Sequence, residues 1–282
     1  MSGTAANRNA GRAGPIVRQL LRLATAAAMV WALAVAAVAA GQEWLIFRPG
    51  TLPPDHRFNV PSDVHETWVE VPGARLNALH LSLPAPDGVV FFLHGNGGHL
   101  GTWFVNPALY RRLNLDLFMI DYRGYGKSTG RIRSEAELHD DVRRAWAHVA
   151  PAYAGQRTVF FGRSLGTGLA AALAAEVQPD ALVLVAPFES LSALAGEHYP
   201  WVPGALLRYP LRTDEALPRV RGEITLIHGE RDTLIPIEHA ERLAAQVPRS
   251  RLVRIVGAGH GDLQAFDAYQ AALAQALGGA GR

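Results

Sequence analysis

Short apolar runs alternate with helix-like stretches over most of the chain after residue 65. The compact runs are typical of strands buried on both faces of a parallel sheet, and they cover 89–95, 116–122, 158–162, 181–187, 224–229 and 251–256. Helices are expected over 134–149, 165–177, 238–247 and 263–277, while 66–71 and 76–83 alternate like an antiparallel pair. The pattern predicts an α/β fold: a mostly parallel central sheet flanked by helices on both faces.

The N-terminal part of the chain has a different pattern. Residues 23–40 carry no charge, and as a helix they would cover about 27 Å, close to the hydrocarbon core of a bilayer. A transmembrane anchor over 23–41 is favoured over a signal peptide cleaved after Ala37-Val38-Ala39. The basic tail, residues 1–22, would stay in the cytoplasm, so in both cases the folded domain lies on the other side.

The remaining boundaries follow from proline. Residues 42–65 form a connector in which Arg48-Pro49-Gly50 and Pro53-Pro54 predict no regular element. The predicted α/β domain then spans 66–282. Prolines and aromatic residues interrupt its strand–helix alternation over 188–220, which predicts a small cap whose aromatics either line a cavity or pack on the body.

Charge and cysteine content exclude several classes of function. Outside the first 42 residues the chain has 23 basic and 25 acidic residues, so the folded part has no cationic surplus to bind nucleic acid. The first 42 residues hold the other four basic residues and no acid: Arg8, Arg12, Arg18 and Arg22. The absence of cysteine excludes disulfides, thiolate catalysis and Cys-ligated metals.

The strongest candidate for chemistry is Ser164, in the sequence GRSLG at 162–166. A predicted strand precedes this G-x-S-x-G motif and a predicted helix follows it, which is the context of a nucleophile on a strained turn. The two glycines are expected because side chains at 162 and 166 would collide with the neighbouring helix and strand. By itself the motif is weak evidence, so its partners matter.

A serine nucleophile needs a base and an acid, which follow it in this order on later loops. Asp232 follows the predicted strand 224–229, and His260 follows the strand 251–256 in a glycine-rich loop. Both positions lie at the carboxyl ends of strands, where sites in open α/β sheets form. His228 is interpreted as structural, and Asp262, the runner-up acid, as a helix N-cap.

An oxyanion hole completes the expected site. HGNGG at 94–98 ends a predicted strand in the position of the loop that supplies one backbone donor, here the N–H of Asn96. The N–H of Leu165 supplies the other. No spacing of His, Asp or Glu predicts a metal site, no Gly-Lys-Ser/Thr predicts phosphate binding, and no cofactor is expected.

Several motifs together resemble a known family, the α/β-hydrolase-fold serine hydrolases, in their membrane-anchored, serine-aminopeptidase-like branch that includes protein depalmitoylases. The resemblance covers roughly residue 44 to the C-terminus and rests on LIFRP (45–49), HGNGG (94–98), DYRGYGKS (121–128), GRSLG (162–166), PFES (187–190), GERD (229–232) and GAGH (257–260). It implies a triad of Ser164, Asp232 and His260 and an oxyanion hole at Asn96 and Leu165.

The resemblance further implies that DYRGYGKS is mainly structural, with Arg123 and Tyr125 as candidate substrate-side groups, and it favours an uncleaved anchor before LIFRP. The preferred hypothesis is a hydrolase of esters or thioesters with lipid-like or other apolar acyl groups. A peptidase with the same triad stays open, and a non-catalytic binding protein is the least favoured alternative.

Overall fold

The computed structural model describes residues 14–279, and the chain divides into two compact units, Met1–Gln42 and Glu43–Arg282. The described part of the first unit holds the helix α1 (Pro15–Ala40), with a mean hydropathy of 2.1 in its most apolar window. This helix is long and apolar enough to cross a membrane, and a signal sequence near the N-terminus has the same properties. It includes Arg18 and Arg22 of the predicted basic tail; residues 1–13 of that tail lie outside the described residues.

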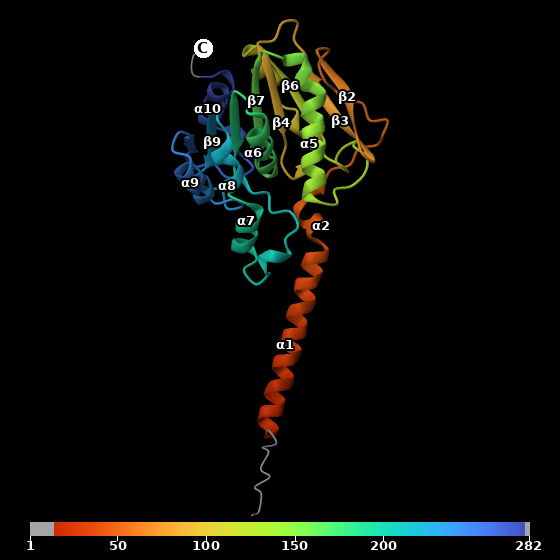
Figure 1. Cartoon of the computed structure of the whole chain (residues 1–282), viewed down its shortest axis with the longest axis vertical. Coiled ribbons are helices and arrows are strands. Elements are labelled where there is room, and N and C mark those ends of the chain that lie inside the picture. Colours follow the sequence, from red (N-terminus) through yellow and green to blue (C-terminus); the bar gives the residue numbers. More distant parts are fainter. Residues whose placement is uncertain (1–13, 280–282) are drawn as a thin grey trace, which may run out of the picture. The chain divides into compact units, whose positions relative to one another are not determined.

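The second unit is built on an eight-stranded sheet with the order β10-β9-β8-β7-β4-β6-β3-β2. Only the pairs β2–β3 and β3–β6 are antiparallel; the other neighbours are parallel. The strands are β2 (Val64–Val71), β3 (Ala74–Leu81), β4 (Gly88–Leu93), β6 (Leu115–Ile120), β7 (Arg157–Arg163), β8 (Ala181–Val185), β9 (Glu223–Gly229) and β10 (Arg251–Ile255). The predicted α/β-hydrolase fold with a mostly parallel sheet is therefore confirmed (Figure 1).

Helices cover both faces of this sheet, and the side chains of one strand alternate between the two cores. In β4, Val89 and Phe91 belong to the buried cluster on one face of the sheet, whereas Val90 and Phe92 belong to the cluster on the other. The helices of the second unit are α2 (Gln42–Ile46), α3 (Leu100–Trp103), α4 (Pro107–Arg112), α5 (Glu135–Val149), α6 (Leu165–Val177), α7 (Leu191–His198), α8 (Thr213–Ala216), α9 (Ile237–Gln246) and α10 (Asp267–Gly278). Packing of helices on both faces thus keeps the strand ends in fixed positions.

The helix α5 begins with a side-chain cap at Ser134. The Ser134 hydroxyl accepts from the N–H of Glu137 at 3.1 Å, as expected of an N-cap. The Glu137 carboxylate, however, accepts from the N–H of Arg133 and not from that of Ser134, so the reciprocal half of a capping box is absent.

The proline-rich connector is more ordered than its sequence predicts. Arg48–Pro49 forms a short strand, β1, that pairs in parallel with β5 (Gly97–Gly98). The prediction of no regular element was wrong because the pairing uses the N–H groups on either side of Pro49: Arg48 donates to Asn96 and Gly50 to Gly98, both at 2.9 Å. This segment therefore belongs to the folded unit and holds the HGNGG loop.

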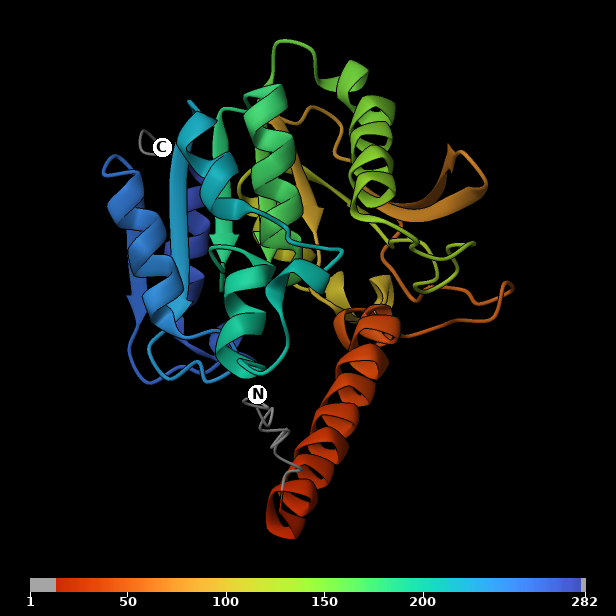
Figure 2. The ribbon, with the colours of Figure 1, turned by 60° about the horizontal axis from the view of Figure 1, so that its bottom comes forward.

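The cap predicted over 188–220 contains α7, α8, two 3-10 turns (Gly204–Leu206 and Leu217–Arg219) and irregular chain. Figures 1 and 2 show α7 beyond the end of β7, at the edge of the sheet where that strand leads into α6. Its aromatic residues have different roles: Tyr199 lines a cavity, whereas Tyr209 is fully buried against Phe47 and donates to Glu43. Of the two roles predicted for the cap aromatics, Tyr199 thus lines a cavity and Tyr209 packs on the body.

Candidate active site

Ser164 lies on a sharp turn between β7 and α6. Its φ of 51° and ψ of −120° lie outside the regions that a residue with a side chain prefers, and the surrounding structure has to maintain that strain. A Cβ at position 162 would lie 2.5 Å from the carbonyl oxygen of Gly166, and one at 166 would lie 2.0 Å from that of Leu93. The glycines of GRSLG are therefore required by contact with α6 and with the end of β4.

The structure brings Ser164 together with the two partners predicted from sequence. Nε2 of His260 lies 3.1 Å from Oγ of Ser164, and Nδ1 lies 2.7 Å from Oδ2 of Asp232. The three residues follow β7, β10 and β9, whose carboxyl ends meet at one edge of the sheet. With the Nδ1–H tautomer donating to Asp232, Nε2 is left to accept the serine proton.

Asp232 is buried and its carboxylate is well supplied with donors. Oδ1 accepts from the N–H groups of Leu234 at 3.0 Å and Ile235 at 2.8 Å. Burial alone would raise the pKa of this carboxyl, but the hydrogen bonds from His228, His260 and the Ile235 N–H outweigh burial and hold the pKa well below its usual range. Asp232 therefore stays ionised opposite the imidazole.

Two further residues, His228 and the runner-up acid Asp262, lie near the candidate triad without belonging to it. His228 is fully buried; its Nε2 lies 2.8 Å from the carbonyl oxygen of Ile235 and 3.4 Å from Asp232, so it braces the loop of the acid. Asp262 makes no side-chain cap, contrary to the expectation of an N-cap. Its carboxylate instead accepts from the N–H of Gly259 at 2.7 Å and fixes the loop that carries His260.

The predicted oxyanion donors, Asn96 and Leu165, both line the cavity next to Ser164. In the described part of the chain, neither backbone N–H donates to a backbone or side-chain acceptor, so both are available to a ligand. The carbonyl of Asn96, by contrast, accepts from the N–H of Arg48 at 2.9 Å and from the hydroxyl of Tyr125 at 2.8 Å. These two bonds fix the peptide that follows Asn96, while the peptide that carries the Asn96 N–H is held at its own carbonyl, that of Gly95, which lies 2.7 Å from Nδ1 of His94.

The DYRGYGKS segment supports the HGNGG loop by hydrogen bonds to its backbone carbonyls. Tyr122 donates to the carbonyl of His94 at 2.8 Å, and Tyr125, fully buried, donates to that of Asn96. Arg123 is buried in a two-bond ion pair with Asp141, at 2.5 and 2.8 Å. Both side chains are buried, out of reach of a substrate, so the suggestion that Arg123 and Tyr125 are substrate-side groups was wrong.

Two cavities of different character adjoin Ser164. The first has a volume of about 330 Å³ and is lined mainly by apolar side chains of the cap and of the segment before β1. The second, about 590 Å³, lies on the side of His260 and is lined by the glycines of the HGNGG loop together with Thr102, Trp103, Val105, Arg163, Gly261 and Gln264. The first is lined by Leu45, Ile46, Arg48, Asn96, Ser164, Leu165, Phe188, Leu191, Leu194, Ala195, His198, Tyr199, Leu207, Leu234 and Ile235.

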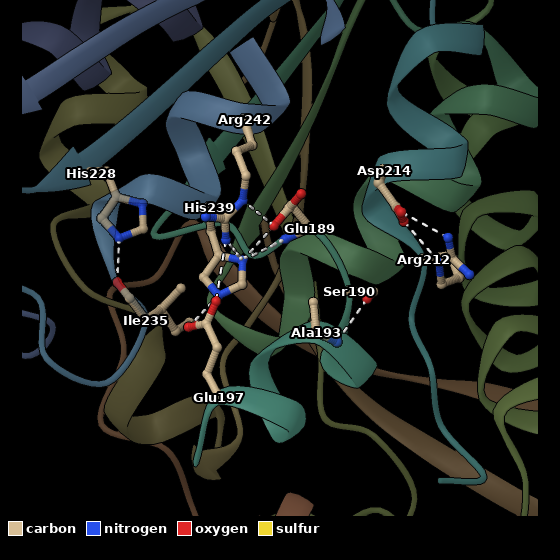
Figure 3. A network of polar contacts seen from close by, with 10 residues as sticks. All are labelled: Glu189, Ser190, Ala193, Glu197, Arg212, Asp214, His228, Ile235, His239 and Arg242. Carbon is tan, nitrogen blue, oxygen red and sulfur yellow. Dashed lines mark hydrogen bonds and ion pairs between the residues drawn. The ribbon is translucent and has the colours of Figure 1, made fainter. Parts of the chain in front are cut away.

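A polar cluster that the sequence reading missed fixes the cap helix α7 against α9 (Figure 3). The His239 ring is fully buried between two carboxylates, with Nδ1 3.2 Å from Glu189 and Nε2 3.3 Å from Glu197. Arg242, one turn further along α9, pairs with the same two carboxylates at 2.5 and 3.3 Å. The cluster sets the position of α7 and hence of its Leu191 and Leu194 in the 330 Å³ cavity, a role that no local sequence signal indicates.

Within residues 14–279, no group of three or more His, Asp or Glu side chains is arranged to hold a metal ion. The polar groups nearest Ser164 are instead an imidazole, a carboxylate and two open backbone N–H groups. This donor set suits attack on a carbonyl carbon by a hydroxyl, with the developing negative charge meeting the N–H groups.

Comparison with known proteins shows which families and folds the chain resembles. Residues 84–212 match the serine aminopeptidase family S33. An uncharacterised protein of Mycobacterium tuberculosis is 35% identical over 184 residues, covering 63% of this chain and 64% of the relative. The human alpha/beta hydrolase domain-containing protein 17B is 27% identical over 198 residues, covering 68% and 67%.

The chain has the α/β-hydrolase fold and is similar in sequence to α/β hydrolases. Among solved structures, an esterase from Pyrococcus furiosus superposes on this chain with a TM-score of 0.64 at 17% identity, over 81% of this chain and 95% of the esterase. That likeness concerns the fold.

Proposed function

We propose that this α/β hydrolase is a serine hydrolase that cleaves an ester or thioester through an acyl-enzyme. The observation that supports the proposal most is the position of His260, whose two ring nitrogens lie 3.1 Å from Ser164 Oγ and 2.7 Å from Asp232 Oδ2. A hydroxyl becomes a useful nucleophile only when a base can remove its proton during attack, and this geometry supplies the base already oriented.

The reaction proceeds in two halves. Ser164 Oγ attacks the carbonyl carbon while Nε2 of His260 takes the proton, and the oxyanion accepts hydrogen bonds from the N–H groups of Asn96 and Leu165. The imidazolium, stabilised by Asp232, then gives its proton to the leaving oxygen or sulfur. Water repeats the sequence on the acyl-enzyme and restores Ser164. Each oxyanion donor contributes roughly 2.7–4 kcal/mol to the transition state.

The apolar cavity suggests the class of acyl group. Its walls carry leucine and isoleucine side chains from the cap and from α2. Transfer of an aliphatic chain from water into this cavity would be favourable by about 25 cal/mol of free energy per Å² of buried apolar surface. A lipid-like or otherwise apolar acyl group is therefore the proposed substrate part.

The catalytic assignment can be tested with a fluorophosphonate probe on the folded protein. We expect one covalent adduct on the peptide containing Ser164, and none on Ser164→Ala, while Ser250→Ala, which removes a serine remote from the motif, labels like the wild type. Intact mass and peptide mass spectrometry locate the adduct, and thermal unfolding confirms that each variant is folded. No adduct on folded wild-type protein, or an adduct on another serine, would refute the assignment.

A peptidase is the second candidate, because the matched family is described as serine aminopeptidase. The same three side chains would act, but amide cleavage requires protonation of a poorer leaving group. A panel of hexanoyl ester, hexanoyl thioester and aminoacyl amide substrates separates the two. Higher kcat/KM on the aminoacyl amides than on the esters would favour the peptidase.

For location, we propose that α1 is an uncleaved anchor with the catalytic unit on the non-cytoplasmic side, the exported form after signal-peptide cleavage being the alternative. The length and hydropathy of α1 and the arginines of the N-terminal segment support this orientation. The intact mass of the mature protein discriminates between the two, since a chain that begins at Ala40 would indicate cleavage.

A further inference from the structure

The two cavities at Ser164 differ in which catalytic group they touch. His260 lines the 590 Å³ cavity and Leu165 lines the 330 Å³ cavity, while Ser164 and Asn96 line both. In the proposed mechanism Nε2 of His260 must reach the leaving atom as well as Ser164 Oγ. The leaving group therefore lies on the His260 side, in the larger cavity, and the acyl group lies in the apolar one.

Arg163 is the one charged side chain, other than His260 when protonated, that lines this larger cavity. It is the last residue of β7, directly before the nucleophile. Its guanidinium lies 5.4 Å from the centre of the Trp103 ring and donates to the carbonyl of His260 at 3.3 Å. Across residues 14–279, no carboxylate lies within ion-pair distance of it, and burial lowers the pKa of the group.

A comparison with Arg123 shows what is missing. Arg163 is half-buried and Arg123 is buried, but Arg123 forms two charge-assisted bonds with Asp141 and a third bond with the carbonyl of Pro72. A desolvated cation normally has such a partner, because burial without one is costly. Arg163 has five N–H donors and one long bond to the protein, so most of its donors are left for a group in the cavity.

We propose that Arg163 is a specificity-determining residue that binds an anionic group, such as a carboxylate, on the leaving part of the substrate. The inference rests on the proposed function and extends it: the preferred substrates are thioesters or esters with an apolar acyl group and a negatively charged leaving group. A planar guanidinium matches a carboxylate with two parallel hydrogen bonds. The ion pair would form beside His260, where the leaving atom receives its proton.

The test uses two thioesters with the same hexanoyl group. In one the leaving thiol is 3-mercaptopropionate, an anion, and in the other it is N-acetylcysteamine, which is neutral. Hydrolysis is followed with a thiol reagent, which reads only the released thiol because the protein contains no cysteine. The variants are Arg163→Gln, Arg163→Lys and the control Arg221→Gln, which removes an exposed charge before β9, at the opposite edge of the sheet from the strand ends that carry the site.

We expect wild-type kcat/KM to be higher for the anionic thioester, and added salt to reduce the preference. Arg163→Gln should lower kcat/KM for the anionic thioester by about tenfold or more and for the neutral one by less than about threefold, while Arg163→Lys keeps part of the preference. Arg221→Gln should leave both values unchanged.

Two results would overturn the inference alone: a wild type without preference, or an Arg163→Gln variant that loses both activities equally, as expected if the side chain only holds the His260 loop. A wild type that hydrolyses neither thioester and does not react with the fluorophosphonate would refute the proposed function, and this inference with it. The two failures are thus distinguishable.

Discussion

Asp232→Asn is the substitution that tests the candidate triad most sharply. It preserves the size of the side chain and can still accept hydrogen bonds from the N–H groups of Leu234 and Ile235. What it removes is the negative charge 2.7 Å from Nδ1 of His260. If the amide NH₂ faces the ring, Nδ1 must accept, the proton moves to Nε2, and Ser164 faces a donor in place of a base.

The expected loss is large because both the tautomer and the charge change. Replacing a triad carboxylate by its amide lowers kcat by about 10³–10⁴, equivalent to roughly 4–5.5 kcal/mol of transition-state free energy. KM should change little, since Asp232 lines neither of the two cavities at Ser164. The oxyanion donors and the nucleophile remain in place in Asp232→Asn. This variant should therefore retain a measurable turnover, higher than that of Ser164→Ala.

The assay is steady-state hydrolysis of a p-nitrophenyl ester by wild type, Asp232→Asn and the matched control Asp262→Asn. Asp262 was the other acid candidate, and its carboxylate bonds to Gly259 N–H without touching the imidazole. An amide oxygen can replace that acceptor, so we expect the control to lose less than about tenfold. Thermal unfolding of all three proteins shows whether the loss is chemical or structural.

Two outcomes would contradict the reasoning. One is an Asp232→Asn variant that keeps more than about a tenth of the wild-type kcat, which is far from the loss expected for a triad acid. The other is an Asp262→Asn variant that is impaired as strongly while still folded. The second would move the acid from the loop after β9 to the loop after β10.

The remaining predictions concern stability and the support of the oxyanion loop. The pKa of Asp232 is lowered in the folded state, so its carboxylate stabilises the fold above the unfolded pKa of about 3.9, and this contribution is lost as the pH falls through the folded pKa. The difference in Tm between wild type and Asp232→Asn should therefore shrink on acidification below about pH 4. Gly166→Ala places a Cβ 2.0 Å from a backbone oxygen and should give insoluble or inactive protein, whereas Gly196→Ala, with nothing within 4 Å in helix α7, should stabilise by up to about 1 kcal/mol in thermal unfolding. Tyr125→Phe removes the bond to the Asn96 carbonyl and should lower kcat by about fivefold, a loss of roughly 1 kcal/mol, with KM nearly unchanged.

The fold and the three side chains of the candidate triad are predictable from sequence for a local reason. Compact apolar runs are typical of strands buried on both faces, and the order of strands and helices along the chain largely dictates a parallel sheet. Parallel strands bring their carboxyl ends to one edge. Once the residues after β7, β9 and β10 were read as Ser164, Asp232 and His260, their proximity followed from topology.

The errors lie where distant segments meet. Nothing near Pro49 indicates that Arg48 and Gly50 donate to the HGNGG loop, and nothing near Tyr125 indicates that its hydroxyl reaches Asn96. Each of these bonds joins groups that satisfy one another only after the chain is packed, so local propensity has no information about them.

The sequence by itself determined the sheet, the strained turn at Ser164 and the chemical type of the residues after the strands, because periodicity and the glycine requirement are properties of short segments. The tertiary structure decided which cavity adjoins which catalytic group, that Arg163 lacks a carboxylate partner within the described residues while Arg123 has one, and that His239 fixes the cap. The physical reason is that cavities and ion pairs depend on side chains contributed by several elements at once, and their distances are set only by packing.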